Sequence, residues 1–186
     1  MAIIKTLRLT TGYSLIRIDH VIFNDGVIKY FTDNDVEVLG KDLMTGEEYD
    51  FIWVNKYGKY ALTGSHGIVT DYLYERKGRD IANGLIRVRK DGKWGLINLN
   101  GEEVVSIKFD FINFSHKYFV IAVLKENNLD FLSKSELKYN CGLLDANGKL
   151  ICPLIFDNIV VTETSIMAWK DGKTGFYINE KGEKLD

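Results

Sequence analysis

Short alternations of apolar and polar residues, separated by glycine-containing turns, run along the whole chain. In the first 48 residues they are LIRID, HVIFN, VIKYF and VEVLG, with breaks at Asn24-Asp25-Gly26 and Thr45-Gly46. A period of two is typical of β-strands with one buried face, and Asn-Gly or Asp-Gly steps between such strands favour tight hairpins. The pattern predicts an all-β protein.

The rest of the chain repeats one plan four times, which indicates a tandem array. The aligned segments are NKYGKYALTGSHGIV from Asn55, RKDGKWGLINLNGEEVV from Arg89, KYNCGLLDANGKLI from Lys138 and WKDGKTGFYINEKGEKL from Trp169. Each is expected to be a strand, a turn, a second strand and a further turn. The first turns are predicted at Tyr57-Gly58, Asp91-Gly92, Tyr139-Asn140 and Asp171-Gly172, and the second turns at Gly67, Gly101, Gly148 and Gly182, spaced by 34, 47 and 34 residues.

Two further marks share this register. A small residue recurs inside the second strand of each copy, at Ala61, Gly95, Gly142 and Gly175. A missing side chain in a strand indicates close approach of another chain segment, and Trp94 beside Gly95 suggests stacking between successive copies. An aromatic residue, an aspartate, any residue and an isoleucine follow one another at 49–52, 109–112 and 156–159; we expect the aromatic residue and the isoleucine to be core anchors and the aspartate to bind nearby backbone.

The interval of 47 residues between the second and third copies implies an insertion of about 13 residues near positions 124–138. Its apolar residues are spaced loosely as on one face of a short surface helix. Leu129, Phe131 and Leu132 are therefore candidate partner-binding residues. Pro153 is expected at a strand edge or bend, where a missing N–H donor is tolerated.

The predicted fold is a set of antiparallel β-hairpin repeats of about 34 residues in an elongated array. We expect two regions: residues 1–48 as a β-rich cap or degenerate repeat, and residues 49–186 as the repeat array with its insertion.

Composition places few limits on function. The formal charge of −2 gives no global attraction to nucleic acid or to a membrane, so neither is an expected partner. Two local basic clusters, at 76–79 and 87–90, are expected to be solvated strand faces. No apolar run approaches the roughly 20 residues of a membrane span, and a cytoplasmic location is expected.

The two cysteines, Cys141 and Cys152, are too few for a disulfide scaffold. With Asn147 and Gly148 as the central residues of a turn, they lie close to facing positions of one hairpin. They are either a redox pair or, as we favour, two buried apolar residues.

The sequence contains no signature of catalysis or cofactor binding. The three histidines, at positions 20, 66 and 116, have no metal-ligand spacing, and no nucleophile elbow or phosphate-binding loop is present. Asp33 and Asp35 alternate as in a calcium loop but lack its glycine and its terminal glutamate. No catalytic, metal or cofactor-binding residue is therefore predicted, and no cofactor.

The stretch VRKDGKWGLINLNGEEVVSIKFDFI resembles a WG repeat, a family named for a Trp-Gly pair that here is Trp94-Gly95. The resemblance is clearest at residues 88–112, is weaker at 138–186 and extends to a degenerate copy at 55–76. It implies a bacterial, β-rich repeat protein with no known common activity, of a kind generally supposed to mediate protein contacts.

Three functions follow as hypotheses. The first is a non-catalytic module that binds a protein partner. The second is a small inhibitor or immunity protein that blocks an enzyme, such as a toxin or a phage-defence nuclease. The third is an unrecognised enzyme or ligand-binding protein that uses Cys141, a histidine, or Asp33 and Asp35.

Overall fold

The structure is a computed structural model of residues 1–186, and it forms two compact units. The first unit comprises Met1–Lys90 and Ile97–Glu102, and the second comprises Asp91–Leu96 and Glu103–Asp186. The residues described here are 7–8, 17–18, 20–22, 28–30, 36–39, 42–47, 51–64, 67–125 and 138–185. All regular structure in these ranges is antiparallel β-strand, so the predicted all-β class is confirmed.

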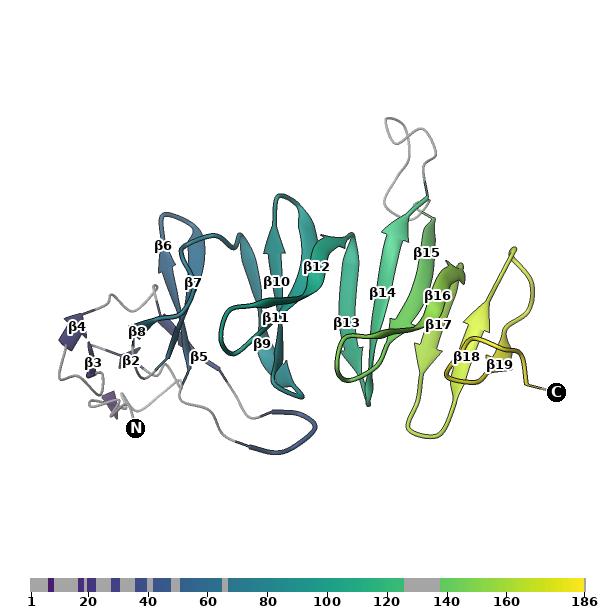
Figure 1. The fold of residues 1–186 in the computed structure, drawn as a ribbon, viewed down its shortest axis with the longest axis horizontal. Helices are drawn as coiled ribbons and strands as arrows, with labels where there is room; N and C mark the ends of the chain where they lie inside the picture. Colours follow the sequence, from purple (N-terminus) through teal and green to yellow (C-terminus); the bar gives the residue numbers. More distant parts are fainter. Residues whose placement is uncertain are drawn as a thin grey trace. The chain divides into compact units, whose positions relative to one another are not determined.

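Within the described ranges, ten strands precede Asp91. They are β1 (Leu7–Arg8), β2 (Arg17–Ile18), β3 (His20–Ile22), β4 (Ile28–Tyr30), β5 (Val36–Val38), β6 (Ile52–Lys56), β7 (Lys59–Gly64), β8 (Gly67–Ile68), β9 (Arg76–Ala82) and β10 (Leu85–Lys90). β5 to β8 form a four-stranded meander, and β9 pairs with β10 across an Asn83-Gly84 turn. Figure 1 shows these strands in purple to teal.

Nine strands follow in the part of the chain that the structure describes. They are β11 (Lys93–Asn98), β12 (Glu103–Phe109), β13 (Phe111–Ser115), β14 (Tyr118–Leu124), β15 (Tyr139–Leu144), β16 (Leu150–Phe156), β17 (Asn158–Val161), β18 (Ile166–Trp169) and β19 (Phe176–Ile178). β13 to β16 form a second four-stranded meander, and β17 to β19 form a three-stranded sheet (Figure 1). The core of this unit joins the two sheets through buried Leu143, Cys152, Phe156, Ile159 and Ile178.

The turns follow the glycine register closely. The backbone φ is positive at both residues of Tyr57-Gly58, Asp91-Gly92 and Asp171-Gly172, the requirement of a type I′ turn. The second turns have positive φ at all four predicted glycines. Three of them share a feature beyond glycine: the side chain of an Asn or Asp accepts backbone N–H groups two and four residues later, at Asn98, Asp145 and Asn179.

The predicted first turn of the third copy, Tyr139-Asn140, is wrong. Both residues lie in β15, where Tyr139 pairs with Leu124 and Asn140 with Val123. The β14–β15 connection is instead the whole segment 125–138, closed by a hydrogen bond from Lys125 N to Lys138 O of 2.8 Å. The insertion therefore replaces the turn. The expected helix falls on residues 126–137, outside the described ranges.

The repeated small residues mark close contacts inside each copy. A Cβ on Gly95 would lie 2.6 Å from the Val105 carbonyl oxygen, and one on Gly142 would lie 2.7 Å from the Cys152 carbonyl oxygen. Both contacts are with the adjacent strand of the same hairpin. Stacking of Trp94 on a neighbouring copy is thus not the reason for Gly95; the close approach of β12 is.

In the second and third copies, the aromatic-Asp-x-Ile sequence lies where the last strand of one sheet leads into the first strand of the next. Phe109, Ile112, Phe156 and Ile159 are all at most 5% exposed, so the core anchors expected at 109–112 and 156–159 are confirmed. The aspartates of these two copies bind backbone as predicted: Leu124 N donates to Asp110 at 2.9 Å, and Gly172 N donates to Asp157 at 3.0 Å. Tyr49 and Asp50 of the first copy lie outside the described residues.

The cysteines are buried and unbonded, but they do not face each other. Register shifts in the β15–β16 pair place Cys141 opposite Phe156 and Cys152 opposite Leu143. The apolar interpretation is confirmed, and the facing geometry is wrong because the sequence does not show these shifts. Pro153 lies in β16, an edge strand of its sheet, as expected.

Candidate functional site

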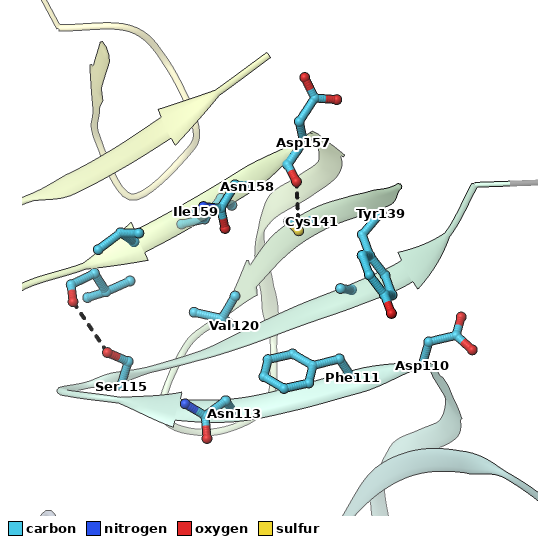
Figure 2. Close-up of a pocket in the computed structure, with 13 residues that line it drawn as sticks. Asp110, Phe111, Asn113, Ser115, Val120, Tyr139, Cys141, Asp157, Asn158 and Ile159 are labelled. Carbon is cyan, nitrogen blue, oxygen red and sulfur yellow. Dashed lines mark hydrogen bonds between the residues drawn. The ribbon is translucent and has the colours of Figure 1, made fainter. Parts of the chain in front are cut away.

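A cleft of about 460 Å³ lies in the second unit, where β17 crosses one face of the β13–β16 sheet (Figure 2). Strand register explains its floor. Phe111 pairs with Ala122 and Ala122 with Cys141, so these three side chains form one row across three strands. Because side chains alternate along a strand, Asn113 and Val120 lie on the same face in the next row. The volume falls within the range of about 300–1,000 Å³ that is usual for ligand sites.

The wall of the cleft is the outer edge of β17. Thr162 N donates to Ser165 O. Because hydrogen-bonded pairs alternate along antiparallel strands, the N–H and C=O groups of Asn158 and Val160 also bond to β18. By the same alternation, the N–H and C=O of Ile159 and the N–H of Val161 face away from β18. The Val161 carbonyl oxygen accepts a hydrogen bond of 3.3 Å from the Ser115 hydroxyl on the cleft side, as Figure 2 shows.

Two aspartates stand at the open end of the cleft, and both are paired. Lys93 Nζ lies 2.6 Å from Asp110, and Lys125 Nζ lies 2.6 Å from Asp157. The hydrogen bond from Lys125 and the N–H of Gly172 hold the pKa of Asp157 below its ordinary value. The aspartates are therefore compensated anions, and the interior of the cleft is mainly apolar.

Lys125 supplies the cation that the aligned segment of the third copy lacks. In the second copy the cation is Lys93, directly after the Asp91-Gly92 turn. The third copy has Asn140 at the matching position, and Lys125 at the base of the insertion supplies the cation instead. Lys125 thus ties the end of β14 to Asp157, directly before β17.

Cys141 contributes a thiol, a group with nucleophilic potential, to the cleft floor. Burial raises the pKa of its thiol, and the neighbouring Asp157 charge raises it further. Its sulfur lies 3.6 Å from the Asp157 carbonyl oxygen (Figure 2). A thiol with a raised pKa is protonated at neutral pH and is a weak nucleophile. Burial likewise raises the pKa of Cys152, to about 11.

The structure does not describe the predicted partner residues. Leu129, Phe131 and Leu132 lie outside the described ranges, as do Asp33, Asp35 and His66, while only the backbone of His20 is described. His116 lies on the β13–β14 turn with φ 54°, apart from the cleft lining. Within the described ranges, no three His, Cys, Asp or Glu side chains are grouped as metal ligands, and no helix is long and apolar enough to span a membrane.

The cleft was not anticipated from the sequence. Its floor has a weak signal in β13, where Asn113 and Ser115 occupy alternate positions that a fully packed strand would fill with apolar residues. The crossing of β17 depends on contacts between residues more than 40 positions apart, such as Ser115 with Val161, which no local pattern reveals.

Two comparisons relate the chain to known proteins. A 152-residue stretch is 22% identical to probable polyketide synthase 29 of Dictyostelium discoideum, and a 168-residue stretch is 23% identical to probable polyketide synthase 39 of the same organism. These matches cover 75% and 81% of this chain but only 5% of each synthase. The family model described as WG containing repeat matches residues 68–94 and 94–128. Residues 68–128 of this chain thus match the WG-containing repeat, the family that the Trp94-Gly95 pair indicated.

Proposed function

We propose that this chain is a non-catalytic protein-binding module, and that its cleft receives an extended segment of the partner beside β17. The observation that carries the proposal is that main-chain groups of Ile159 and Val161 face away from β18, above the apolar floor of the cleft. Addition of a strand to an open sheet edge gives main-chain hydrogen bonds, while pockets beside the edge select side chains.

The dimensions of the site suit a short segment. Hydrogen bonds to Cys141 and Ser115 engage the carbonyl groups of Asp157 and Val161 at the two ends of the edge. The groups between them, the N–H and C=O of Ile159 and the N–H of Val161, match one or two residues of an incoming strand. A side chain of that strand would lie over Val120 and Ala122.

The rim adds apolar contact area. Phe111 is 46% exposed and Val160 is 42% exposed, one on each side of the cleft. Burial of such surface stabilises a complex by about 25 cal/mol per Å² before the cost of association. The predicted partner residues Leu129, Phe131 and Leu132 precede Tyr139 of the cleft lining in the sequence.

Two features support binding rather than catalysis. The Cys141 thiol has a raised pKa, and the described residues that line the cleft include no histidine to serve as its base. Both aspartates at the mouth are engaged by lysine and by backbone N–H groups.

The test uses peptides selected against the whole protein from a phage-displayed library of random 12-residue sequences. Affinities of synthetic peptides are then compared for the wild type, Val160→Arg and Val104→Arg. The two valines are matched strand residues, 42% and 41% exposed, and only Val160 lines the cleft.

We expect Val160→Arg to weaken the selected peptides by tenfold or more and Val104→Arg to leave their affinity unchanged. Equal binding to all three proteins would place the peptide site elsewhere. Failure to enrich any peptide would also count against the proposal.

A further inference from the structure

Charge is unevenly distributed along this chain. Residues 51–90 contain eight Lys and Arg and three Asp and Glu, a net charge of +5, although the whole chain carries −2. A local excess of this size attracts anions even when the global charge does not.

The fold of the first unit brings the two basic clusters together. In the β9–β10 pair, Arg76 lies opposite Arg89, and Lys77 lies opposite Val88. Like charges placed directly opposite each other destabilise a sheet. The Nε atom of Arg89 is buried and has no hydrogen-bond partner in the described part of the chain. This pairing is costly in the absence of an anion.

Tyrosine rings are interleaved with these cations. Lys56 Nζ lies 5.5 Å from the Tyr57 ring centroid and 5.9 Å from that of Tyr72. Lys77 Nζ lies 5.5 Å from the Tyr60 ring centroid. A backbone bridge joins Tyr60 to Tyr74, and Lys59 pairs with Glu75 at 3.4 Å, so the β6–β7 hairpin contacts the residues directly before β9.

Tyr57 is the most informative residue of this basic tyrosine surface. It has φ 54° in a tight turn, a conformation that is unfavourable for a bulky side chain. The comparable turns place Asn83, Asp91 and Asp171 there. Its ring is also 93% exposed, so packing within the protein does not explain it. Strained, exposed aromatic residues point to a ligand.

We propose that this surface binds single-stranded nucleic acid. Phosphate groups contact Lys56 and Lys77, and one base stacks on Tyr57. Single-stranded binding sites combine a cationic track with aromatic platforms, because every base has a π-face. An acidic protein segment would use the cations but not the bare ring, and a duplex would keep its bases stacked inside. The surface lies in the first unit and is independent of the proposed peptide cleft.

The experiment measures fluorescence anisotropy of a fluorescein-labelled 15-nucleotide oligo(dT) with the full-length protein across a salt series. Tyr57→Asn places a favoured residue in the turn, so folding is preserved while stacking is lost. We expect about a tenfold loss of affinity for Tyr57→Asn. Tyr57→Phe keeps the ring and should bind like the wild type.

Charge is tested separately. The double variant Lys56→Gln/Lys77→Gln should reduce the slope of log K against log salt by about 1.4, since each phosphate contact in a single strand contributes about 0.7. The control Lys173→Gln/Lys181→Gln removes two lysines of the second unit and should leave the slope unchanged.

Three results would overturn the proposal. They are no binding of the oligonucleotide at 50 mM salt, equal affinity for a 15-base-pair duplex, and displacement by poly-glutamate as effective as displacement by unlabelled oligo(dT). The last result would assign the surface to an acidic protein segment instead.

Discussion

Gly95 and Gly175 occupy the same position in two copies of the repeat, yet different atoms fill the space left by the missing side chain. At Gly95 that space holds the backbone of β12, with the Ile107 Cα 2.8 Å from an ideal Cβ. At Gly175 it holds the Trp169 ring, whose nearest atoms lie 2.6 to 2.9 Å away. Both copies therefore have a glycine at this position, but the atoms that fill the space beside it differ between copies.

The aspartates that hold turns differ in a parallel way. Asp42 in the first unit is 1% exposed and accepts backbone N–H groups from Met44, Thr45, Asn83 and Gly84. Asp157 in the second unit also holds a turn glycine, Gly172, but its side chain is 31% exposed and it relies on Lys125 as well. The buried Asp42 thus depends on backbone N–H donors, whereas the more exposed Asp157 also depends on an ion pair.

The largest effect is expected for Gly95→Ala. Its methyl group would meet backbone atoms of β12, which cannot move without breaking the hairpin, so the free energy of unfolding should fall by about 3 kcal/mol. Chemical denaturation monitored by tryptophan fluorescence measures this. A loss below about 1 kcal/mol would mean that β12 does not approach Gly95 closely.

A smaller loss, about 2 kcal/mol at pH 7, is expected for Asp42→Asn, which removes charge-assisted hydrogen bonds from a buried site. Burial raises the pKa of Asp42, but the four N–H donors outweigh that and lower it overall. A carboxyl with a lowered folded pKa contributes stability above its unfolded pKa, near 4, and loses it as the pH falls through the folded value.

The difference in unfolding free energy between Asp42→Asn and the wild type should therefore narrow below about pH 4. Denaturation curves at pH 7, 4 and 3 provide the comparison. A difference that stays constant with pH would show that the charge on Asp42 is not what holds the Asn83-Gly84 turn.

The smallest effect is expected for Gly175→Ala, about 1 kcal/mol, because the half-buried Trp169 ring can rotate away. Its emission spectrum should shift as the ring moves. If Gly175→Ala lowered the free energy of unfolding as much as Gly95→Ala, the two glycine sites would be equivalent. The contrast between backbone and side-chain neighbours would then be wrong.

Local chemistry made much of this fold predictable. The Asp91-Gly92 and Asp171-Gly172 turns follow from the need for positive φ, and the aromatic-Asp-x-Ile mark identified both core anchors and backbone-binding aspartates. The Asn83-Gly84 turn carries the same signal but lies outside the four aligned segments, so the repeat register did not include it.

The strand register and the long-range contacts could not be predicted from the sequence. The shifts between β15 and β16 moved Cys152 opposite Leu143, and a 14-residue connection replaced the turn expected at Tyr139-Asn140. The cleft depends on how β17 crosses the β13–β16 sheet, through contacts such as Ser115 to Val161 between residues more than 40 positions apart. This is a property of packing between sheets rather than of any local pattern.

The proposed strand-receiving edge can be tested in the free protein by amide hydrogen exchange resolved by NMR. Fast exchange is expected at Ile159 and Val161, whose N–H groups face the cleft, and slow exchange at Asn158 and Val160, whose N–H groups bond to β18. An alternating pattern along these four residues is the expected result. Slow exchange at Ile159 in the absence of a partner would contradict an open edge and remove the basis for the proposed binding site.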